Sequence, residues 1–435
     1  MILPEYDGRC GWYELLENVS AFPALEGDAR FDTVIVGGGF VGTAAARRLA
    51  QNCPDERVLL IDALKLGQGA SGRNSGFVID QPHKRDLERA DDPFKRKIVR
   101  LNRIAMEHLE QQIADFGIDC QWSHAGKYQG AVGPRGLKFL AHYEQLLRNF
   151  GESYERLSGA ELRAVLGTDY YSAAIFTPGG VLMQPAALMR GLADSMPANV
   201  RVVENTPVQE IRRQTQGFTL KTPTSTLSCR RIVLATSIFT AELGFKKDRI
   251  LPVMTFASMT RPLTDAEMAC FGGQLDWGLT PADHAGTTMR MTQDRRLIIR
   301  NSYRYAPEYN TPAAILPKIR ARHREGLDQR YPALKEVEIV YTWGGATSLS
   351  ANFETYFGQL DEGIYSSGCD QSVGAARGTV SGLMLADMMC GKNTEALRDM
   401  QEVSGNPSCL PPKLLLRVGV PLRMALARFA SRSEL

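Results

Sequence analysis

The chain has 435 residues, of which 44% are hydrophobic, and its formal net charge at pH 7 is only +3. A chain of this length can bury a large core, and two interleaved domains are expected. The small net charge and the lack of any nucleic-acid-reading motif argue against a protein that binds a polyanion, so no nucleic-acid partner is expected.

The beginning of the chain and its cysteines indicate the compartment. The first residues hold no apolar stretch of the kind found in a secretory signal, and no apolar run is long enough to span a membrane. The eight cysteines are scattered, without a C-x-x-C pair or a zinc-ligand spacing, so we expect reduced thiols and no metal site. These features predict a cytoplasmic protein without a transmembrane segment.

The most specific motif follows an amino-terminal extension, residues 1–30. A β-branched run, Thr33 to Val36, leads into a G-x-G-x-x-G motif and a helix rich in small residues. Glycines at this spacing allow a tight turn, a close approach of backbone to a pyrophosphate, and close packing of helix on strand. The three glycines are Gly37, Gly39 and Gly42.

A second predicted strand, 57–61, ends at Asp62. A carboxylate at this position can accept hydrogen bonds from both ribose hydroxyls, and it would repel a 2′-phosphate. Strand, helix, second strand and terminal acid together predict a Rossmann-like dinucleotide-binding domain. The motif alone does not separate FAD from NAD.

The segment 67–77, GQGASGRNSGF, favours FAD. Its small residues let the backbone run against a flat ligand. Here the chain resembles the flavoprotein oxidases of the D-amino-acid oxidase superfamily, the group of glycine oxidase and monomeric sarcosine oxidase. GASGRNSG is especially similar to the γ-glutamylputrescine oxidase branch. In this part of the chain the resemblance implies cofactor contacts at Phe40, Val41, Ala63, Ala70, Ser71, Arg73, Asn74, Ser75 and Gly76.

Later segments extend the resemblance over nearly the whole chain. Residues 180–192 resemble the family's lead into the helix that returns to the nucleotide domain, and 205–211 and 231–235 resemble its later strands. Residues 363–387 resemble the strand, loop and helix that present backbone donors to the flavin pyrimidine. Further implied contacts are Val208, Ala235, Trp343, Gly344, Gly368, Gln371, Ser372, Val373 and Gly374.

Cys369 lies in this last loop, but the cysteine that joins flavin covalently in some relatives falls earlier in the chain. We therefore predict non-covalent FAD.

The intervening segments predict a second domain. We expect helices over 84–119, 137–150 and 315–331, a hairpin over 121–132, several short antiparallel strands within 249–303, and a strand over 337–345.

The predicted fold is α/β, with a Rossmann-like FAD-binding domain interleaved with a substrate domain built on a mixed or antiparallel sheet. The first comprises residues 31–85, 180–248 and 345–400, and the second 86–179 and 249–344. A basic amphipathic tail, 401–435, is expected to dock on the protein's own surface, and peripheral membrane contact is the less favoured alternative.

The resemblance implies that an amine carbon gives a hydride to flavin N5, with dioxygen as the expected acceptor. In amino-acid-oxidising relatives an arginine just after the strand that matches Trp343 binds the substrate carboxylate, and Thr347 stands at that position here. The sequence thus favours an amine or amino-acid-like substrate other than plain glycine, sarcosine or a D-amino acid. A dehydrogenase of the same fold acting on a hydroxy acid or amine, and a flavin-binding protein with vestigial catalysis, stay open.

Arg300 stands where relatives usually carry glycine on the sheet that faces the flavin. Pointing inward, it could bind an anionic group of the substrate or stabilise charge on reduced flavin, and an exposed arginine is the alternative. Ile298 occupies the position of the oxygen-activating lysine of some relatives. The catalytic candidates are Arg300, Thr347 and Tyr303, and weaker pocket candidates are His83, Arg290, Met291 and Tyr305.

Overall fold

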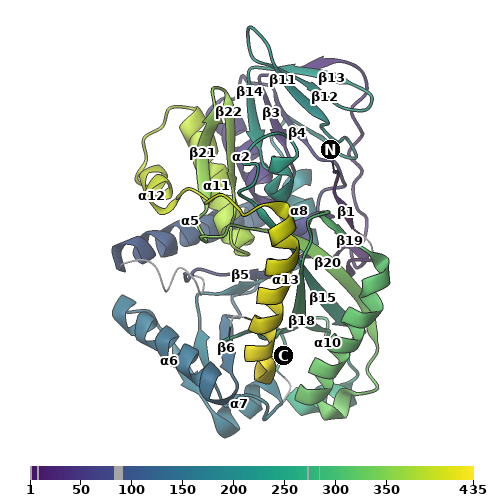
Figure 1. Cartoon of the computed structure of the whole chain (residues 1–435), viewed down its shortest axis with the longest axis vertical. Coiled ribbons are helices and arrows are strands. Elements are labelled where there is room, and N and C mark those ends of the chain that lie inside the picture. Colours follow the sequence, from purple (N-terminus) through teal and green to yellow (C-terminus); the bar gives the residue numbers. More distant parts are fainter. Residues whose placement is uncertain (1, 7–8, 83–91, 272–273, 284) are drawn as a thin grey trace.

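The computed structural model describes residues 2–6, 9–82, 92–271, 274–283 and 285–435. His83 lies outside these residues. Two large sheets follow one another along the long axis of the molecule (Figure 1), and the chain crosses between them several times.

The first sheet has six strands in the order β10-β4-β3-β14-β22-β21, and all its pairs are parallel except β21 with β22. Its β3 and β4 strands are buried along their whole length, as expected for a parallel sheet covered on both faces. The strands are β3 (Thr33–Val36), β4 (Val58–Ile61), β10 (Val200–Val203), β14 (Arg231–Leu234), β21 (Tyr356–Asp361) and β22 (Ile364–Gly368).

Two helices rich in small residues lie side by side on this sheet. A Cβ atom on Gly382 of α11 would lie 2.3 Å from the Val41 carbonyl oxygen of α2, so the close helix contact requires glycine. The helices of this half are α2 (Phe40–Asn52), α3 (Ala70–Arg73), α5 (Asp92–Phe116), α8 (Pro185–Asp194), α11 (Gly374–Met389) and α12 (Glu395–Val403).

The second sheet has eight strands in the order β20-β15-β18-β17-β16-β6-β8-β7, antiparallel except for the parallel pair β16 and β6. Its strands are β6 (Lys127–Ala131), β7 (Glu155–Leu157), β8 (Ala173–Thr177), β15 (Leu251–Thr260), β16 (Trp277–Pro281), β17 (Thr288–Met291), β18 (Leu297–Tyr305) and β20 (Ile339–Leu349). The helices nearby are α6 (Gly133–Phe150), α7 (Gly159–Leu166), α9 (Asp265–Met268) and α10 (Leu316–Arg330).

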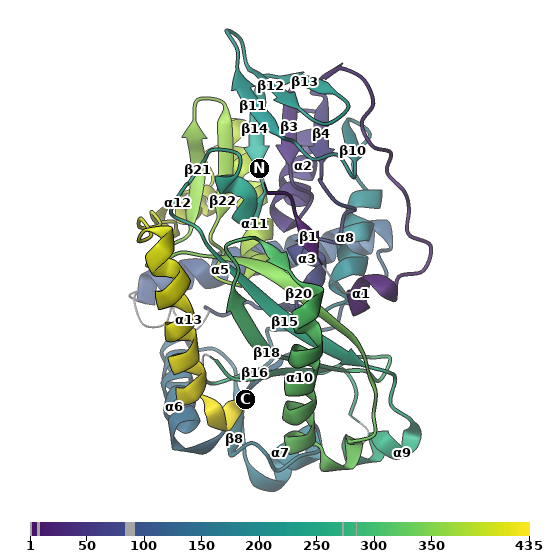
Figure 2. The same cartoon turned by 45° about the vertical axis from the view of Figure 1, so that its right-hand side comes forward.

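The smaller strands form further sheets, and β11, β12 and β13 lie at the end of the molecule next to the six-stranded sheet (Figure 2). A four-stranded sheet has the order β11-β12-β13-β2, and β1 and β5 pair with β19 and β9. These elements are α1 (Gly11–Glu14), β1 (Glu5–Tyr6), β2 (Ala29–Arg30), β5 (Phe77–Val78), β9 (Val181–Leu182), β11 (Glu210–Arg213), β12 (Phe218–Lys221), β13 (Thr226–Cys229) and β19 (Asn310–Thr311).

The predicted α/β fold with a mixed sheet is confirmed, but the predicted hairpin over 121–132 is wrong. Only β6 forms a strand there, and its partners β8 and β16 come from distant parts of the chain. Gln121 and Gly126 have φ angles of 51° and 69°, so the chain before β6 is not extended. Ser123 makes only an isolated bridge with Leu182.

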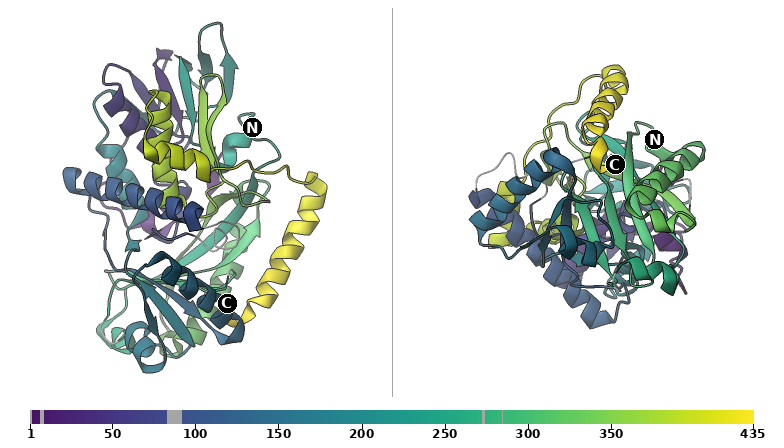
Figure 3. Two further views of the ribbon diagram at one scale, coloured as in Figure 1. Left: turned by 90° about the vertical axis from the view of Figure 1, so that its left-hand side faces the viewer. Right: turned by 90° about the horizontal axis from the view of Figure 1, so that it is seen from below.

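Helix α13 (Lys413–Ala430) runs along the outside of the molecule, beside the half that holds the eight-stranded sheet (Figure 3). Within the described residues, no helix is both long enough and apolar enough to cross a membrane.

Candidate functional site

A cavity of about 830 Å³ is bounded by residues of both large sheets, and we call it the central cavity. Its size is in the range of small-molecule and cofactor sites. Residues of α2, α3 and the loop before α11 line one side, and residues of β6, β15, β17 and β18 line the other.

The turn between β3 and α2 leaves no room for side chains. Gly37 has a φ of 105°, and a Cβ atom there would lie 2.5 Å from the Ala235 carbonyl oxygen. A Cβ atom on Gly42 would lie 1.8 Å from the Gly37 carbonyl oxygen. The N-cap residue of helix α2, Gly39, has no side chain, and the Phe40 N–H donates to the Ser71 hydroxyl (3.1 Å), so the start of the helix still presents its positive end to an anion. This turn therefore fits the pyrophosphate of a dinucleotide.

Asp62 lies at the end of β4 beside this turn. Its carboxylate accepts hydrogen bonds from the backbone N–H groups of Gly38 (2.7 Å) and Leu64 (2.8 Å). Burial raises the pKa of Asp62 to about 6. The acid is therefore held next to the glycine turn, where the motif predicts the ribose.

Not every predicted nucleotide contact lines the central cavity. Gly39, Phe40, Val41 and Ala235 line it, whereas Gly37, Gly42, Asp62, Ala63 and Val208 do not. Val208 is buried in the core with Val34 and Val36 of β3.

The segment 70–77 forms the next part of the wall, and side chains behind it hold it in place. The Arg73 guanidinium donates to the Gln68 carbonyl (2.7 Å) and the Gly344 carbonyl (3.0 Å). The Trp343 indole donates to the Arg73 carbonyl (3.0 Å), and the Trp12 indole donates to the Asn74 carbonyl (2.8 Å). The predicted contacts that line the cavity here are Ala70, Ser71, Arg73, Asn74 and Ser75.

Three weaker pocket candidates lie elsewhere. Arg290 is fully buried behind the wall, where its guanidinium donates to the carbonyls of Gly76 (3.2 Å) and Met183 (2.5 Å). Met291 is packed in the core, and Tyr305, like the other two, is outside the cavity lining. Strand alternation predicted which residues share a face, but it did not show how far the cavity extends along each strand.

The loop between β22 and α11 has an unusual backbone. Cys369, Gln371 and Ser372 have φ angles of 56°, 54° and 70°. Such strained conformations of non-glycine residues persist where surrounding contacts stabilise them, often at functional sites. Here the Gln371 amide stabilises the loop by donating hydrogen bonds to the Ser350 hydroxyl (3.1 Å) and the Cys369 carbonyl (2.9 Å).

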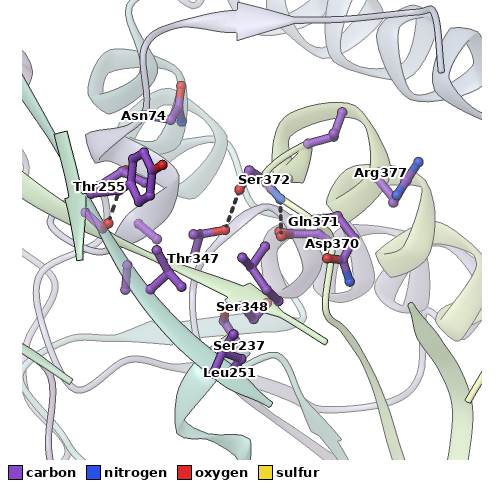
Figure 4. Close-up of a pocket in the computed structure, with 18 of the residues that line it drawn as sticks. Asn74, Ser237, Leu251, Thr255, Thr347, Ser348, Asp370, Gln371, Ser372 and Arg377 are labelled. Atoms are coloured by element: carbon purple, nitrogen blue, oxygen red, sulfur yellow. Dashed lines mark hydrogen bonds between the residues drawn. The ribbon is translucent and has the colours of Figure 1, made fainter. Parts of the chain in front are cut away.

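Thr347 joins β20 to this loop, because its hydroxyl lies 3.0 Å from the Ser372 hydroxyl (Figure 4). Asp370 lines the cavity, and its carboxylate accepts a hydrogen bond from the Ser372 N–H (3.2 Å). Burial raises the pKa of Asp370. The predicted residues of this loop that line the cavity are Gly368, Gln371, Ser372, Val373 and Gly374, whereas Cys369, Trp343 and Gly344 do not line it.

Arg300 and Tyr303 of β18 line the opposite side of the cavity. The Arg300 guanidinium donates to the Thr288 hydroxyl of β17 (3.1 Å), and burial lowers its pKa. Within the described part of the chain, no carboxylate lies at ion-pair distance from Arg300. Ile298, two residues earlier, is packed in a core cluster with Trp12 and Trp343.

The sequence did not indicate a second cation in the cavity, Lys127 of β6. Its ammonium donates to the Gln129 amide oxygen (3.2 Å) and lies 5.0 Å from the centre of the Tyr143 ring. Burial lowers its pKa to about 8. Other lining residues that were not predicted include Gln129, Tyr143, Thr288, Asp370, Arg377, Arg423 and Met424.

The comparisons with known proteins agree with this geometry. A family model described as FAD dependent oxidoreductase matches residues 32–388. The chain is 25% identical to gamma-glutamylputrescine oxidoreductase of Escherichia coli over 85% of this chain and 86% of that protein. It is 23% identical to the probable oxidoreductase OrdL of Haemophilus influenzae over 85% of each chain.

Among solved structures, glycine oxidase from Bacillus cereus shares the fold, with a TM-score of 0.71 at 20% sequence identity over 86% of this chain and 99% of that chain. The family match spans both halves of the fold and the turn between β3 and α2. The chain therefore belongs to the FAD dependent oxidoreductase family, and it is an FAD-dependent enzyme of the amine and amino acid oxidase type.

Proposed function

We propose that this enzyme oxidises a C–N bond of an amine that also carries a carboxylate, and that dioxygen is the electron acceptor. The observation that supports this substrate class is Arg300, a half-buried cation in the lining of the central cavity that donates a hydrogen bond to the neutral Thr288 hydroxyl. Bound FAD supplies the two-electron oxidising chemistry.

A partly desolvated guanidinium without a counter-charge is unfavourable, and a substrate carboxylate would provide a counter-charge through charge-assisted hydrogen bonds. The Thr288 hydroxyl accepts from one guanidinium nitrogen and restricts its rotation. Arg300 therefore presents its remaining donors in a fixed direction. In this proposal Arg300 takes over the carboxylate-binding role for which position 347 offers only a threonine.

The other charges of the cavity favour the same class. Arg73, Lys127, Arg377 and Arg423 add positive charge to the lining, and Asp370 adds a carboxylate. An excess of positive charge in a cavity attracts an anionic substrate. The named substrates of two similar proteins, gamma-glutamylputrescine and glycine, each carry an amine and a carboxylate.

The cavity offers surroundings for the cofactor as well as for the substrate. The N-termini of α2 and α11 and the segment 70–75 would hold FAD. Arg300 and Tyr303 face the same space from β18. Arg300 would hold the substrate carboxylate, and the residues of β15 and β20 along the lining would exclude water from the reacting carbon.

The test is an anaerobic titration of the FAD-loaded enzyme with matched pairs of amines, such as glycine and methylamine or γ-glutamylputrescine and putrescine. Reduction is followed as loss of flavin absorbance at about 450 nm. We expect the carboxylate-bearing member of a pair to reduce the enzyme at a concentration at least about tenfold lower. Equal reduction by both members of every pair, or reduction by hydroxy acids alone, would contradict the proposed substrate class.

The acceptor is tested separately by mixing the reduced enzyme with dioxygen or with an artificial dye. Rapid recovery of the absorbance with dioxygen is expected. Slow recovery with dioxygen and rapid recovery with the dye would identify a dehydrogenase instead. If no amine or hydroxy acid reduces FAD that is demonstrably bound, catalysis is vestigial and the whole proposal fails.

A further inference from the structure

Helix α13 has two faces with different surroundings. One face, which we call the cavity face, borders the central cavity and includes Leu416, Val420, Arg423, Met424 and Ala427, and Leu415 and Gly419 also line the cavity. The opposite face, which we call the outer face, consists of the apolar residues Leu414, Val418, Leu422, Leu426 and Phe429. Residues of each face recur at intervals of three or four, the helical repeat.

The outer face is the most exposed apolar surface among the described residues. Its side chains are 75, 68, 59, 62 and 67% exposed in chain order, whereas the most exposed large apolar side chain outside α13 is Phe116, at 50%. Single exposed apolar residues are common, but five in one continuous row indicate a surface that binds something.

The ends of this segment are firmly attached, so the row is not a loose tail. Before α13, the Leu410 N–H donates to the Asp248 carbonyl (2.6 Å). After it, the buried Glu434 carboxylate accepts from the backbone N–H groups of Val132 (3.1 Å) and Asp283 (3.0 Å). The helix is therefore held at both ends along the outside of the molecule (Figure 3), and its apolar row is exposed.

The charged residues of α13 and its flanking residues are all basic. Residues 411–433 contain Lys413, Arg417, Arg428 and Arg432, besides Arg423 on the cavity face, and no acidic residue, and Arg417 lies 3.4 Å from Glu308 of another segment. An exposed apolar row beside basic residues is the arrangement of a helix that lies in the interface of an anionic bilayer. A second copy of the chain docked on this face would bring the two sets of cations together, which disfavours self-association.

We propose that the outer face of α13 binds the surface of an anionic lipid bilayer, with the apolar row inserted among the acyl chains and the cations at the headgroups. Because the cavity face belongs to the same helix, binding places the central cavity next to the bilayer. This inference does not rest on the proposed substrate.

The experiment measures co-sedimentation of the full-length, FAD-loaded enzyme with vesicles of phosphatidylcholine alone or with roughly one-third phosphatidylglycerol. We expect binding to the anionic vesicles that weakens when salt is raised from about 0.05 M to about 0.5 M. The outer-face variant V418S/L422S/L426S is expected to bind at least about tenfold more weakly.

A matched control, L3S/V19S/L275S, removes three exposed apolar residues away from α13 and should bind like the wild type. The charge variant K413Q/R417Q changes exposed side chains outside the cavity lining and should weaken binding to anionic vesicles without changing retention of FAD. This second variant keeps the test decisive if the outer-face variant does not fold.

Three results would overturn the proposal. They are equal binding to neutral and anionic vesicles, unchanged binding of both α13 variants, and a wild-type dimer in analytical ultracentrifugation that dissociates in the outer-face variant. The last would show that a second copy covers the outer face.

Discussion

On the side of the six-stranded sheet, the central cavity is bounded by the turn at Gly39 to Val41, the segment 70–75 and the loop before α11, and we call this side the backbone wall because small residues and loops dominate it. On the side of the eight-stranded sheet it is bounded by side chains, above all Lys127, Arg300 and Tyr303. The backbone wall tolerates few substitutions because an added Cβ atom would collide with the main chain. The other side, which we call the side-chain wall, can change its charged residues without a change in the backbone.

The two walls suit two different ligands, the cofactor and the substrate. The backbone wall offers helix N-termini and N–H groups, which suit a cofactor that all members of a family share. The side-chain wall offers cations at chosen places, which suits a substrate that differs among members. Substitutions on the first side should therefore act on FAD binding, and substitutions on the second should act on substrate binding with FAD retained.

The largest effect is expected for Gly42→Ala. The new Cβ atom would lie 1.8 Å from the Gly37 carbonyl oxygen, and neither backbone can move without opening the turn. Overpacking of this kind costs about 1–3 kcal/mol, and its upper limit corresponds to FAD affinity lowered about a hundredfold. The measurement is titration of the apoprotein with FAD, followed by flavin fluorescence.

The matched control is Gly69→Ala, because nothing lies within 4 Å of its added Cβ atom and its φ is −78°. Equal FAD affinity of the two variants would contradict the expectation that the close backbone contact at Gly42 is needed for FAD binding.

The next effect is expected for Arg300→Gln. Loss of charge-assisted hydrogen bonds to a substrate carboxylate costs about 1.5–3 kcal/mol, so kcat/KM for a carboxylate-bearing amine should fall about ten- to a hundredfold. FAD binding should stay within a factor of about two, because Arg300 lies on the other wall. Steady-state kinetics and FAD titration check the two statements.

Arg304→Gln is the control, since Arg304 lies on the same strand but outside the cavity lining. A similar loss for Arg304→Gln, or an equal loss for amines with and without a carboxylate, would show that Arg300 does not bind the carboxylate.

The backbone wall was the part that sequence could predict. Glycines at this spacing after a β-branched run are typical of a strand, turn and helix that bind a dinucleotide. The ends of the two strands within residues 33–62 were therefore predicted to within a residue or two. The side-chain wall depends on which strands become neighbours. Lys127 reaches the cavity because β6 pairs with β8 and β16, and no local pattern shows that pairing.

Two interpretations of the sequence failed because both depend on which distant segments pack together. Alternation along β17 suggested that Arg290 faces a pocket, but its side chain is buried and its guanidinium donates a hydrogen bond to the Gly76 carbonyl. The hairpin over 121–132 assumed that neighbouring segments pair, whereas β6 pairs over long separations. The tail was recognised as amphipathic, but only tertiary structure shows which face borders the cavity.

The third effect, on the free energy of unfolding, is expected for Lys127→Met. Burial lowers the lysine pKa from 10.5 to about 8, with Asp80 opposing the shift. Between these pH values the folded protein has released a proton that the unfolded chain still holds, so the wild type gains stability as pH rises from about 8 to 10.5. The variant should lack this rise and be more stable at pH 7 by about 1–3 kcal/mol.

Urea unfolding of the apoprotein at several pH values gives the free energy of unfolding directly. Lys138→Met, which replaces an exposed lysine of α6, is the control and should keep the wild-type rise. A variant at position 127 that loses stability at pH 7 would show that the ammonium has a stabilising partner there, and Lys127 would then not count as a free positive charge of the side-chain wall.

The smallest effect is expected for Thr347→Val, at the border between the two walls. The Thr347 hydroxyl contacts the Ser372 hydroxyl at 3.0 Å, and a neutral hydrogen bond of this kind contributes about 0.5–1.5 kcal/mol. We expect kcat/KM to fall by no more than about tenfold, because Arg300 and not position 347 binds the carboxylate. Thr347→Ser, which keeps the hydroxyl, should restore the wild-type value. A loss of about a hundredfold in the valine variant alone, with FAD retained, would place the substrate against Thr347 and move the carboxylate site from the side-chain wall to the backbone wall.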